Sequence, residues 1–230
     1  FRFEQRPRRG SGLQSLNRQQ RTIRSSWTTR AGVRPDGELT VNSPPLTTPR
    51  TDWLALTTED AIDPDLPICD PHHHLWDRPG FRYMLDELLV DIGGGHNITE
   101  TVFVECSSMY RKDGPESMSP VGETEFVAGI AAQSASGEYG DTKVAAGIVG
   151  YADLSLGSAV EEVLEAHIVA GGGRFRGVRN SSCWDQDHEI HGYKDPPKRL
   201  LGKTSFREGF AVLNNLGLSF DAWLYHTQLS

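Results

Sequence analysis

Cysteine and long apolar runs are both scarce in this chain. Its three cysteines, Cys69, Cys106 and Cys183, form no C-x-x-C pair and are odd in number, which argues against a disulfide framework. No stretch approaches the run of about 20 apolar residues that a membrane helix needs. No secretory apolar segment is visible either. We therefore expect a protein of the reducing cytoplasm that has no membrane partner.

Lysine is absent from residues 1–50, although this segment contains ten arginines and only three acids. The segment carries a charge of +7, so the remainder must carry −15 to give the net charge of −8. It lacks apolar periodicity and is rich in Ser, Thr, Pro and Gln. We therefore expect residues 1–55 to be a disordered extension and residues 56–230 to form the folded domain.

Three interpretations of the arginine-rich extension remain open. It has the composition of an organellar transit peptide, and a basic arm is also typical of nucleic-acid binding. The chain starts with Phe1 rather than Met, so the segment also fits upstream sequence from an incomplete reading frame. We favour the third interpretation. Because aromatic residues are hardly interleaved with the arginines of the extension, we expect no nucleic-acid partner.

A glycine-rich phosphate loop is also missing, and this absence distinguishes two α/β folds. Strand patterns alternate with helical patterns, which predicts parallel βαβ units. A doubly wound nucleotide-binding sheet would place a glycine-rich loop after its first strand. The glycines at 171–173 instead end a helix and precede a strand. We expect strands over 68–75, 101–106, 144–154, 174–180 and 218–224, and helices over 123–135, from a capping box of Ser158 and Glu161 to Gly171, and over 205–215.

Polar residues follow each of the expected strands. Chemistry gathered at the carboxyl ends of parallel strands is the arrangement of a (β/α)8 barrel active site. The fold class that we predict is therefore α/β of the (β/α)8 TIM-barrel type, represented by its first five strands. The candidate residues at these ends are His72 and His74, Glu105, Tyr151 and Asp153, Arg176 and Arg179, and His226.

Three consecutive histidines end the first expected strand. Alternate side chains of a strand share a face, so His72 and His74 should point one way and His73 the other. Two imidazoles on one face can bind a single divalent ion, and neutral imidazole suits zinc and also iron, nickel or copper. We predict that His72 and His74 are metal ligands and that His73 packs on the other face or contacts solvent.

The strand motifs together resemble one enzyme superfamily. DPHHHLWD (residues 70–77) is similar to the first-strand motif of the amidohydrolase superfamily, and more narrowly of its amidohydrolase-related, sugar-lactonase-like branch. The similarity continues through the motifs FVEC (103–106), GIVGYAD (147–153), FRGVR (175–179) and LSFDAW (218–223) with His226. It covers about residues 66–230 in order.

The resemblance implies a metal-dependent hydrolase that opens a lactone or related cyclic ester. It implies that His72, His74 and His226 bind a divalent metal, with zinc preferred, and that His226 alternatively contacts the substrate. Relatives add a histidine on the sixth strand and a catalytic aspartate on the eighth. Residues 66–230 hold five strands where a complete barrel needs eight and about 250 residues. We therefore expect a fragment whose catalytic aspartate lies beyond Ser230, and negligible hydrolase activity from these 230 residues alone.

Several roles remain open at the sequence level. Arg179 and Tyr151 are candidate contacts for a small-molecule substrate. Arg179 can hold a substrate carboxylate or form a salt bridge to a neighbouring strand, and Glu105 can orient a ligating histidine or form such a bridge. A decarboxylase of the same superfamily and an inactive relative are the alternative functions. The oligomeric state stays open.

Overall fold

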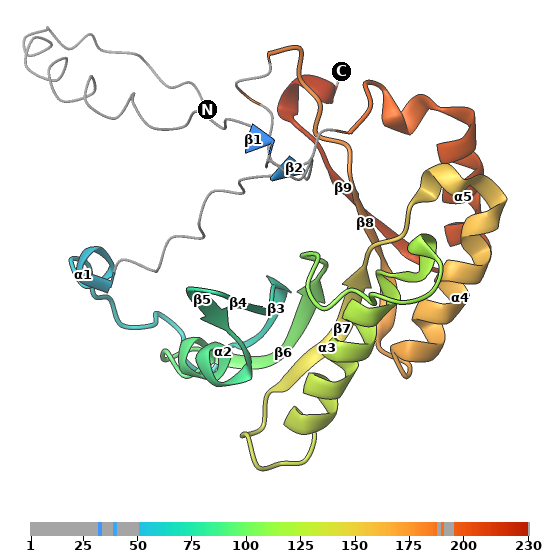
Figure 1. The fold of residues 1–230 in the computed structure, drawn as a ribbon. Helices are drawn as coiled ribbons and strands as arrows, with labels where there is room; N and C mark the ends of the chain where they lie inside the picture. Colours follow the sequence, from blue (N-terminus) through green and yellow to red (C-terminus); the bar gives the residue numbers. More distant parts are fainter. Residues whose placement is uncertain (1–31, 34–38, 41–50, 188–189, 191–195, 230) are drawn as a thin grey trace, which may run out of the picture. The chain divides into compact units, whose positions relative to one another are not determined.

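The computed structural model describes residues 32–33, 39–40, 51–187, 190 and 196–229 (Figure 1). The chain divides into two compact units, Phe1–Pro45 and Leu46–Ser230. In the first unit, the short strands β1 (Gly32–Val33) and β2 (Leu39–Thr40) pair antiparallel. Most of the segment that we expect to be disordered lies outside the described residues. The second unit begins its described part with the one-turn helix α1 (Thr51–Leu54).

A parallel five-stranded sheet forms the centre of the second unit. Its strands lie in the order β3-β6-β7-β8-β9, which is also their order along the chain, and every neighbouring pair is parallel. Figure 1 shows the sheet curled like half of a barrel. The predicted parallel α/β architecture is thus confirmed as a half-barrel. The strands are β3 (Pro67–His73), β6 (Asn97–Val104), β7 (Lys143–Gly150), β8 (Phe175–Ser181) and β9 (Ser219–Trp223).

Three helices connect the later strands and cover one face of the sheet (Figure 1). They are α3 (Val121–Ser134), α4 (Val160–Ala170) and α5 (Thr204–Asn215), each at a position where the apolar spacing predicts a helix. The core between helices and sheet is apolar, and burying each large side chain contributes about 1.5–3 kcal/mol. Its largest fully buried members include Phe103, Ile148, Leu164, Phe206 and Leu213.

The start of helix α4 differs from the expected capping box. Ser158 lies inside the 3₁₀ segment η2 (Leu154–Ala159), and Ala159, which has no capping side chain, precedes the first residue of the helix. Asp153 instead caps η2, because its Oδ1 accepts a hydrogen bond from the Ser155 amide at 2.9 Å. The predicted box is wrong because the chain enters α4 already helical, whereas an N-cap serine needs an extended backbone.

Two apolar residues that lie at helical spacing with buried residues of α4 and α5 are themselves exposed. Ile168 of α4 is 37% exposed and Phe210 of α5 is 44% exposed. His167 occupies the buried face beside Ile168, where it donates to the Tyr151 carbonyl from Nε2 at 3.0 Å and pairs through Nδ1 with Thr124 Oγ1 at 2.8 Å. Apolar periodicity misses such a residue because hydrogen bonds make a polar side chain acceptable in a core.

The stretch between β3 and β6 contains elements that we did not predict. Strands β4 (Trp76–Arg78) and β5 (Phe81–Tyr83) form an antiparallel hairpin, and helix α2 (Leu85–Ile92) follows. The signal for α2 was present, since Leu85, Leu88, Leu89 and Ile92 have helical spacing. Across the parts of the chain that the structure describes, no helix combines the length and apolarity needed to cross a membrane.

Candidate metal site at the strand ends

The two outer histidines of the triplet lie side by side at the end of β3. The Nε2 atoms of His72 and His74 are 3.2 Å apart, and the two rings meet edge to face. His73 points into the core, where it is 7% exposed and its Nε2 pairs with Thr101 Oγ1 at 2.9 Å. The alternation predicted from the strand period is confirmed.

Hydrogen bonding determines which nitrogen of His74 carries the proton. Nδ1 lies 2.7 Å from the Val104 carbonyl oxygen, which only accepts, so Nδ1 must be the donor. Burial lowers the pKa of His74 to about 4, and the Val104 carbonyl opposes this shift only in part. A neutral ring protonated at Nδ1 presents a lone pair at Nε2, toward His72. Ligating histidines commonly show this orientation by a backbone carbonyl.

The spacing of the two nitrogens matches that of two ligands on one cation. Zinc–nitrogen bonds are about 2.0–2.1 Å long, and two such bonds span 3.2 Å when the angle between them is about 100°. This angle is close to tetrahedral. The two nitrogens can therefore occupy two of the four coordination positions of one zinc-like ion.

Among the residues that the structure describes, no third ligand joins this pair. His226 lies in the 3₁₀ segment η4 (His226–Gln228) beyond β9, and its side chain is exposed. His226 follows β9, the edge strand farthest from β3 in the sheet order. Within the described ranges, no group of three or more His, Cys, Asp or Glu side chains is arranged to hold a metal.

A buried ion pair lies directly beside His72. Arg179 at the end of β8 donates from Nε to Glu105 Oε1 at 3.0 Å and from Nη2 to the Glu105 carbonyl at 2.5 Å. The two side chains are 9% and 0% exposed. Nη1 of Arg179 lies 3.5 Å from His72 Nε2. Of the roles left open for Arg179 and Glu105, the structure contains the salt bridge between them. Nη1 of Arg179 faces the histidine pair.

The other arginine of β8 lies elsewhere. Arg176 is exposed and donates from Nη1 to the Gly173 carbonyl at 2.7 Å. Arg176 and Arg179 are three positions apart on β8 and therefore lie on opposite faces of the strand, and only Arg179 reaches the histidine pair.

Aromatic side chains border the charged groups. The Arg179 guanidinium lies over the Trp223 ring, with Cζ 4.7 Å from the ring centroid, and the Trp76 ring lies 5.0 Å from that of His74. Tyr151, half-buried just after β7, has its pKa raised to about 12 by burial and by the charges of Asp153 and Glu105. Its phenol therefore keeps its proton near neutral pH. We did not assign Trp223 to the site, although its position at a strand end was a usable signal.

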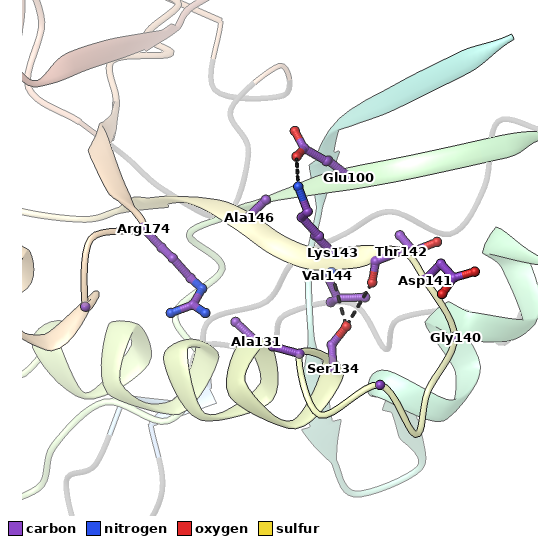
Figure 2. A pocket seen from close by; sticks show the side chains of 13 residues that line it. Glu100, Ala131, Ser134, Gly140, Asp141, Thr142, Lys143, Val144, Ala146 and Arg174 are labelled. Carbon is purple, nitrogen blue, oxygen red and sulfur yellow. Dashed lines mark hydrogen bonds and ion pairs between the residues drawn. The ribbon is translucent and has the colours of Figure 1, made fainter.

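A cavity of about 640 Å³ lies at the opposite end of the sheet, among the first residues of β7, the end of α3 and Arg174 (Figure 2). Lys143 and Glu100 form an ion pair of 3.1 Å in its wall. Figure 2 shows the Arg174 side chain directed toward helix α3. None of the predicted site residues lines this cavity.

Comparison with known proteins supplies a relative without a stated function. The chain is 27% identical over 187 residues to the uncharacterized protein y4mH of Sinorhizobium fredii, a match that covers 72% of this chain and 56% of that protein. The chain thus spans about half the length of this relative. No family model matches the chain. No solved structure matches it either.

Proposed function

We propose that this chain carries the first metal ligands of a metal-dependent hydrolase of the amidohydrolase-related branch, built on a (β/α)8 barrel. The 3.2 Å separation between His72 Nε2 and His74 Nε2 is the observation that carries the proposal. The curled parallel sheet and the polar residues at its carboxyl ends support it. We infer that the substrate is a lactone or a related cyclic ester and that the ion is zinc.

His72, His74 and Tyr151 each have a role in this proposal. When bound, such a cation lowers the pKa of a coordinated water to near 7 and polarises the substrate carbonyl. His72 and His74 would hold it through Nε2, and the Val104 carbonyl keeps His74 in the ligating tautomer. Tyr151, which stays protonated, can donate a hydrogen bond to a substrate oxygen. The third ligand and the general base, an aspartate on an eighth strand, remain predictions.

Arg179 and Glu105 would act as a pair. A lone guanidinium 3.5 Å from His72 Nε2 would repel a cation bound there, but the Glu105 carboxylate offsets this charge. Nη1 still faces the site, where it can stabilise negative charge that develops on a substrate oxygen. A substrate carboxylate would meet this one nitrogen, because Glu105 holds the other two.

Metal binding is tested by titrating the chain with Co²⁺, a spectroscopic substitute for zinc, and recording its visible absorption. We expect His72→Ala and His74→Ala each to weaken binding at least tenfold, the usual scale for losing one ligand or its support. His96→Ala is the matched control, because His96 is exposed and precedes β6 at the other end of the sheet. Unchanged Co²⁺ affinity in both site variants would overturn the proposal.

The reaction class is tested on a zinc-loaded protein whose reading frame is long enough to supply the later strands of a barrel. A panel of five- and six-membered lactones is followed by base consumption, and candidate acids are followed by release of carbon dioxide. Ring opening that disappears in His72→Ala supports the hydrolase. Carbon dioxide release without ring opening would favour the decarboxylase instead.

A further inference from the structure

The loop that follows β6, residues 105–110, has an unusual backbone. Ser107 and Met109 are not glycines, yet their φ angles are 61° and 53°. This left-handed region is unfavourable for residues that carry a Cβ, so surrounding contacts must hold the loop in place. The loop also passes very close to helix α3, because a Cβ at Gly122 would lie 2.6 Å from the Met109 carbonyl oxygen.

Glu123 of helix α3 supplies contacts of this kind. Its Oε1 accepts hydrogen bonds from the Cys106 amide at 3.0 Å and from the Ser108 amide at 2.7 Å. The side chain is 1% exposed, and Oε2 has no hydrogen-bond partner among the described residues. Burying a carboxylate in apolar surroundings costs free energy unless hydrogen bonds compensate for the lost hydration. Here it binds the two amides that flank Ser107.

The same loop connects three neighbouring parts of the candidate site. Glu105 holds Arg179, the Cys106 carbonyl accepts from Arg78 Nη2 at 3.1 Å, and Ser108 Oγ donates to the Leu75 carbonyl at 2.8 Å. Leu75 directly follows His74. A change in the loop would therefore reach both the ion pair beside His72 and the residue after His74.

We propose that Glu123 is a positioning residue, whose carboxylate holds the loop after β6 in the shape that places Glu105 against Arg179 beside His72. Its effect on Arg179 is a property of the fold. Its importance for metal binding and catalysis rests on the proposed function.

The first test follows the Arg179 Nε–Hε resonance and the exchange rates of the Cys106 and Ser108 amide protons by NMR. We expect Glu123→Ala to accelerate exchange of both amides at least tenfold and to broaden or shift the Arg179 resonance. Glu123→Gln keeps an acceptor oxygen and should preserve the Arg179 resonance. Glu125→Ala is the matched control, because Glu125 lies on the same helix and pairs with Arg111 at the surface.

A pH titration tests whether the Glu123 carboxylate binds the loop amides or whether the side chain only fills space beneath the loop. Burial raises the pKa of Glu123 to about 7, although the two amides act in the opposite direction. Among the described residues, Glu105, Cys106 and Tyr110 interact electrostatically with it. Burial raises the pKa of Cys106 to about 12 and also raises that of Tyr110, so both stay protonated near pH 7. The Cys106 and Ser108 amide shifts should titrate near pH 7 in the wild type and not in Glu123→Gln.

The outcomes distinguish this proposal from the proposed function. An unchanged Arg179 resonance in Glu123→Ala would overturn the positioning role, as would exchange of the Cys106 and Ser108 amides as slow as in the wild type. If Glu123→Ala does not fold, Glu123→Asp, which shortens the side chain by one methylene, replaces it in both measurements. A perturbed Arg179 resonance in a chain that binds no Co²⁺ would uphold the positioning role while the metal proposal fails.

Discussion

The two ends of the parallel sheet each carry an ion pair between residues in or directly after different strands, but the pairs differ in burial. At the carboxyl end, the Arg179 and Glu105 side chains are 9% and 0% exposed. At the amino end, the Lys143 and Glu100 side chains are 73% and 42% exposed (Figure 2). The contact distances are similar, at 3.0 Å and 3.1 Å.

The difference in burial changes what each pair can do. Water screens an exposed pair, so its net contribution to stability is usually below about 1 kcal/mol. A buried pair keeps a strong local field but makes each charge dependent on the other, because an unpaired buried charge is very costly. The buried pair at the carboxyl end therefore holds the Arg179 charge in a fixed position next to His72. The exposed pair at the amino end contributes mainly to the hydration of the surface.

The largest expected effect comes from breaking the buried pair. Arg179→Met leaves the Glu105 carboxylate buried without its partner, and we expect the free energy of unfolding to fall by about 3–5 kcal/mol. Urea unfolding followed by circular dichroism measures this change. The double variant Glu105→Leu with Arg179→Met removes both charges and should recover most of the loss. A single-variant cost below about 1 kcal/mol would show that the two ends of the sheet do not differ in this way.

Acid stability provides the next largest effect, through a buried group of the helix layer. Burial lowers the pKa of His167 to about 4, below its usual value of 6.5, and the hydrogen bond to the Tyr151 carbonyl opposes the shift. Between about pH 6.5 and 4, His167 is protonated in the unfolded chain but stays neutral in the folded chain. The unfolding free energy should therefore fall as the pH drops from about 6.5 to 4, by about 3 kcal/mol for this group.

His167→Gln isolates this contribution, because an amide can both donate to Tyr151 and accept from Thr124 but does not titrate. Wild type and variant are compared by urea unfolding at pH 7 and pH 4. We expect the wild type to lose about 3 kcal/mol more than the variant over this range. Equal losses would contradict the assignment of the acid sensitivity to His167.

A smaller effect is expected at a buried polar contact of the amino end. Ser134 is 3% exposed, and its Oγ donates to the Thr142 carbonyl at 3.0 Å and accepts from the Val144 amide at 3.3 Å. Ser134→Ala should cost about 1 kcal/mol, because it removes two hydrogen bonds while the Thr142 carbonyl and the Val144 amide keep their contact with each other. Thermal unfolding measures the change. Ser136→Ala in the exposed turn beyond α3 is the control and should have almost no effect.

The smallest effect is expected for the exposed ion pair itself. Lys143→Met should change the unfolding free energy by less than about 1 kcal/mol, and salt should reduce the difference further. The measurement is urea unfolding at low and high salt. A cost as large as that of Arg179→Met would mean that the two ends of the sheet are equivalent.

Local sequence patterns predicted the main elements of the sheet but not their details. The five strands were found because short runs containing apolar residues alternate with helical patterns along the chain. The paired orientation of His72 and His74 follows from the two-residue strand period. The β4–β5 hairpin was missed because its strands are three residues each and carry charged side chains. The buried role of His167 was missed because it depends on Thr124 and Tyr151, which are distant in sequence.

The candidate site was predictable to the same limited extent. Strand ends identified His72, His74, Arg179 and Tyr151, since parallel strands bring their carboxyl ends together. Arg179 contacts Glu105, and its guanidinium lies over Trp223. Both contacts depend on the relative twist and register of β6, β8 and β9. Glu123 was not recognised, because an acidic residue on a helix normally faces solvent.

The sequence by itself determined that the chain builds a parallel α/β sheet and that two histidines share one face at the end of its first strand. Both follow from periodicity, which acts over a few residues. The tertiary structure alone decided that His226 stays away from this pair, that Glu105 takes two nitrogens of Arg179, and that Glu123 lies buried under the loop after β6. These outcomes depend on burial and on contacts between distant segments, because the energy of a charge is set by what surrounds it rather than by its neighbours in sequence.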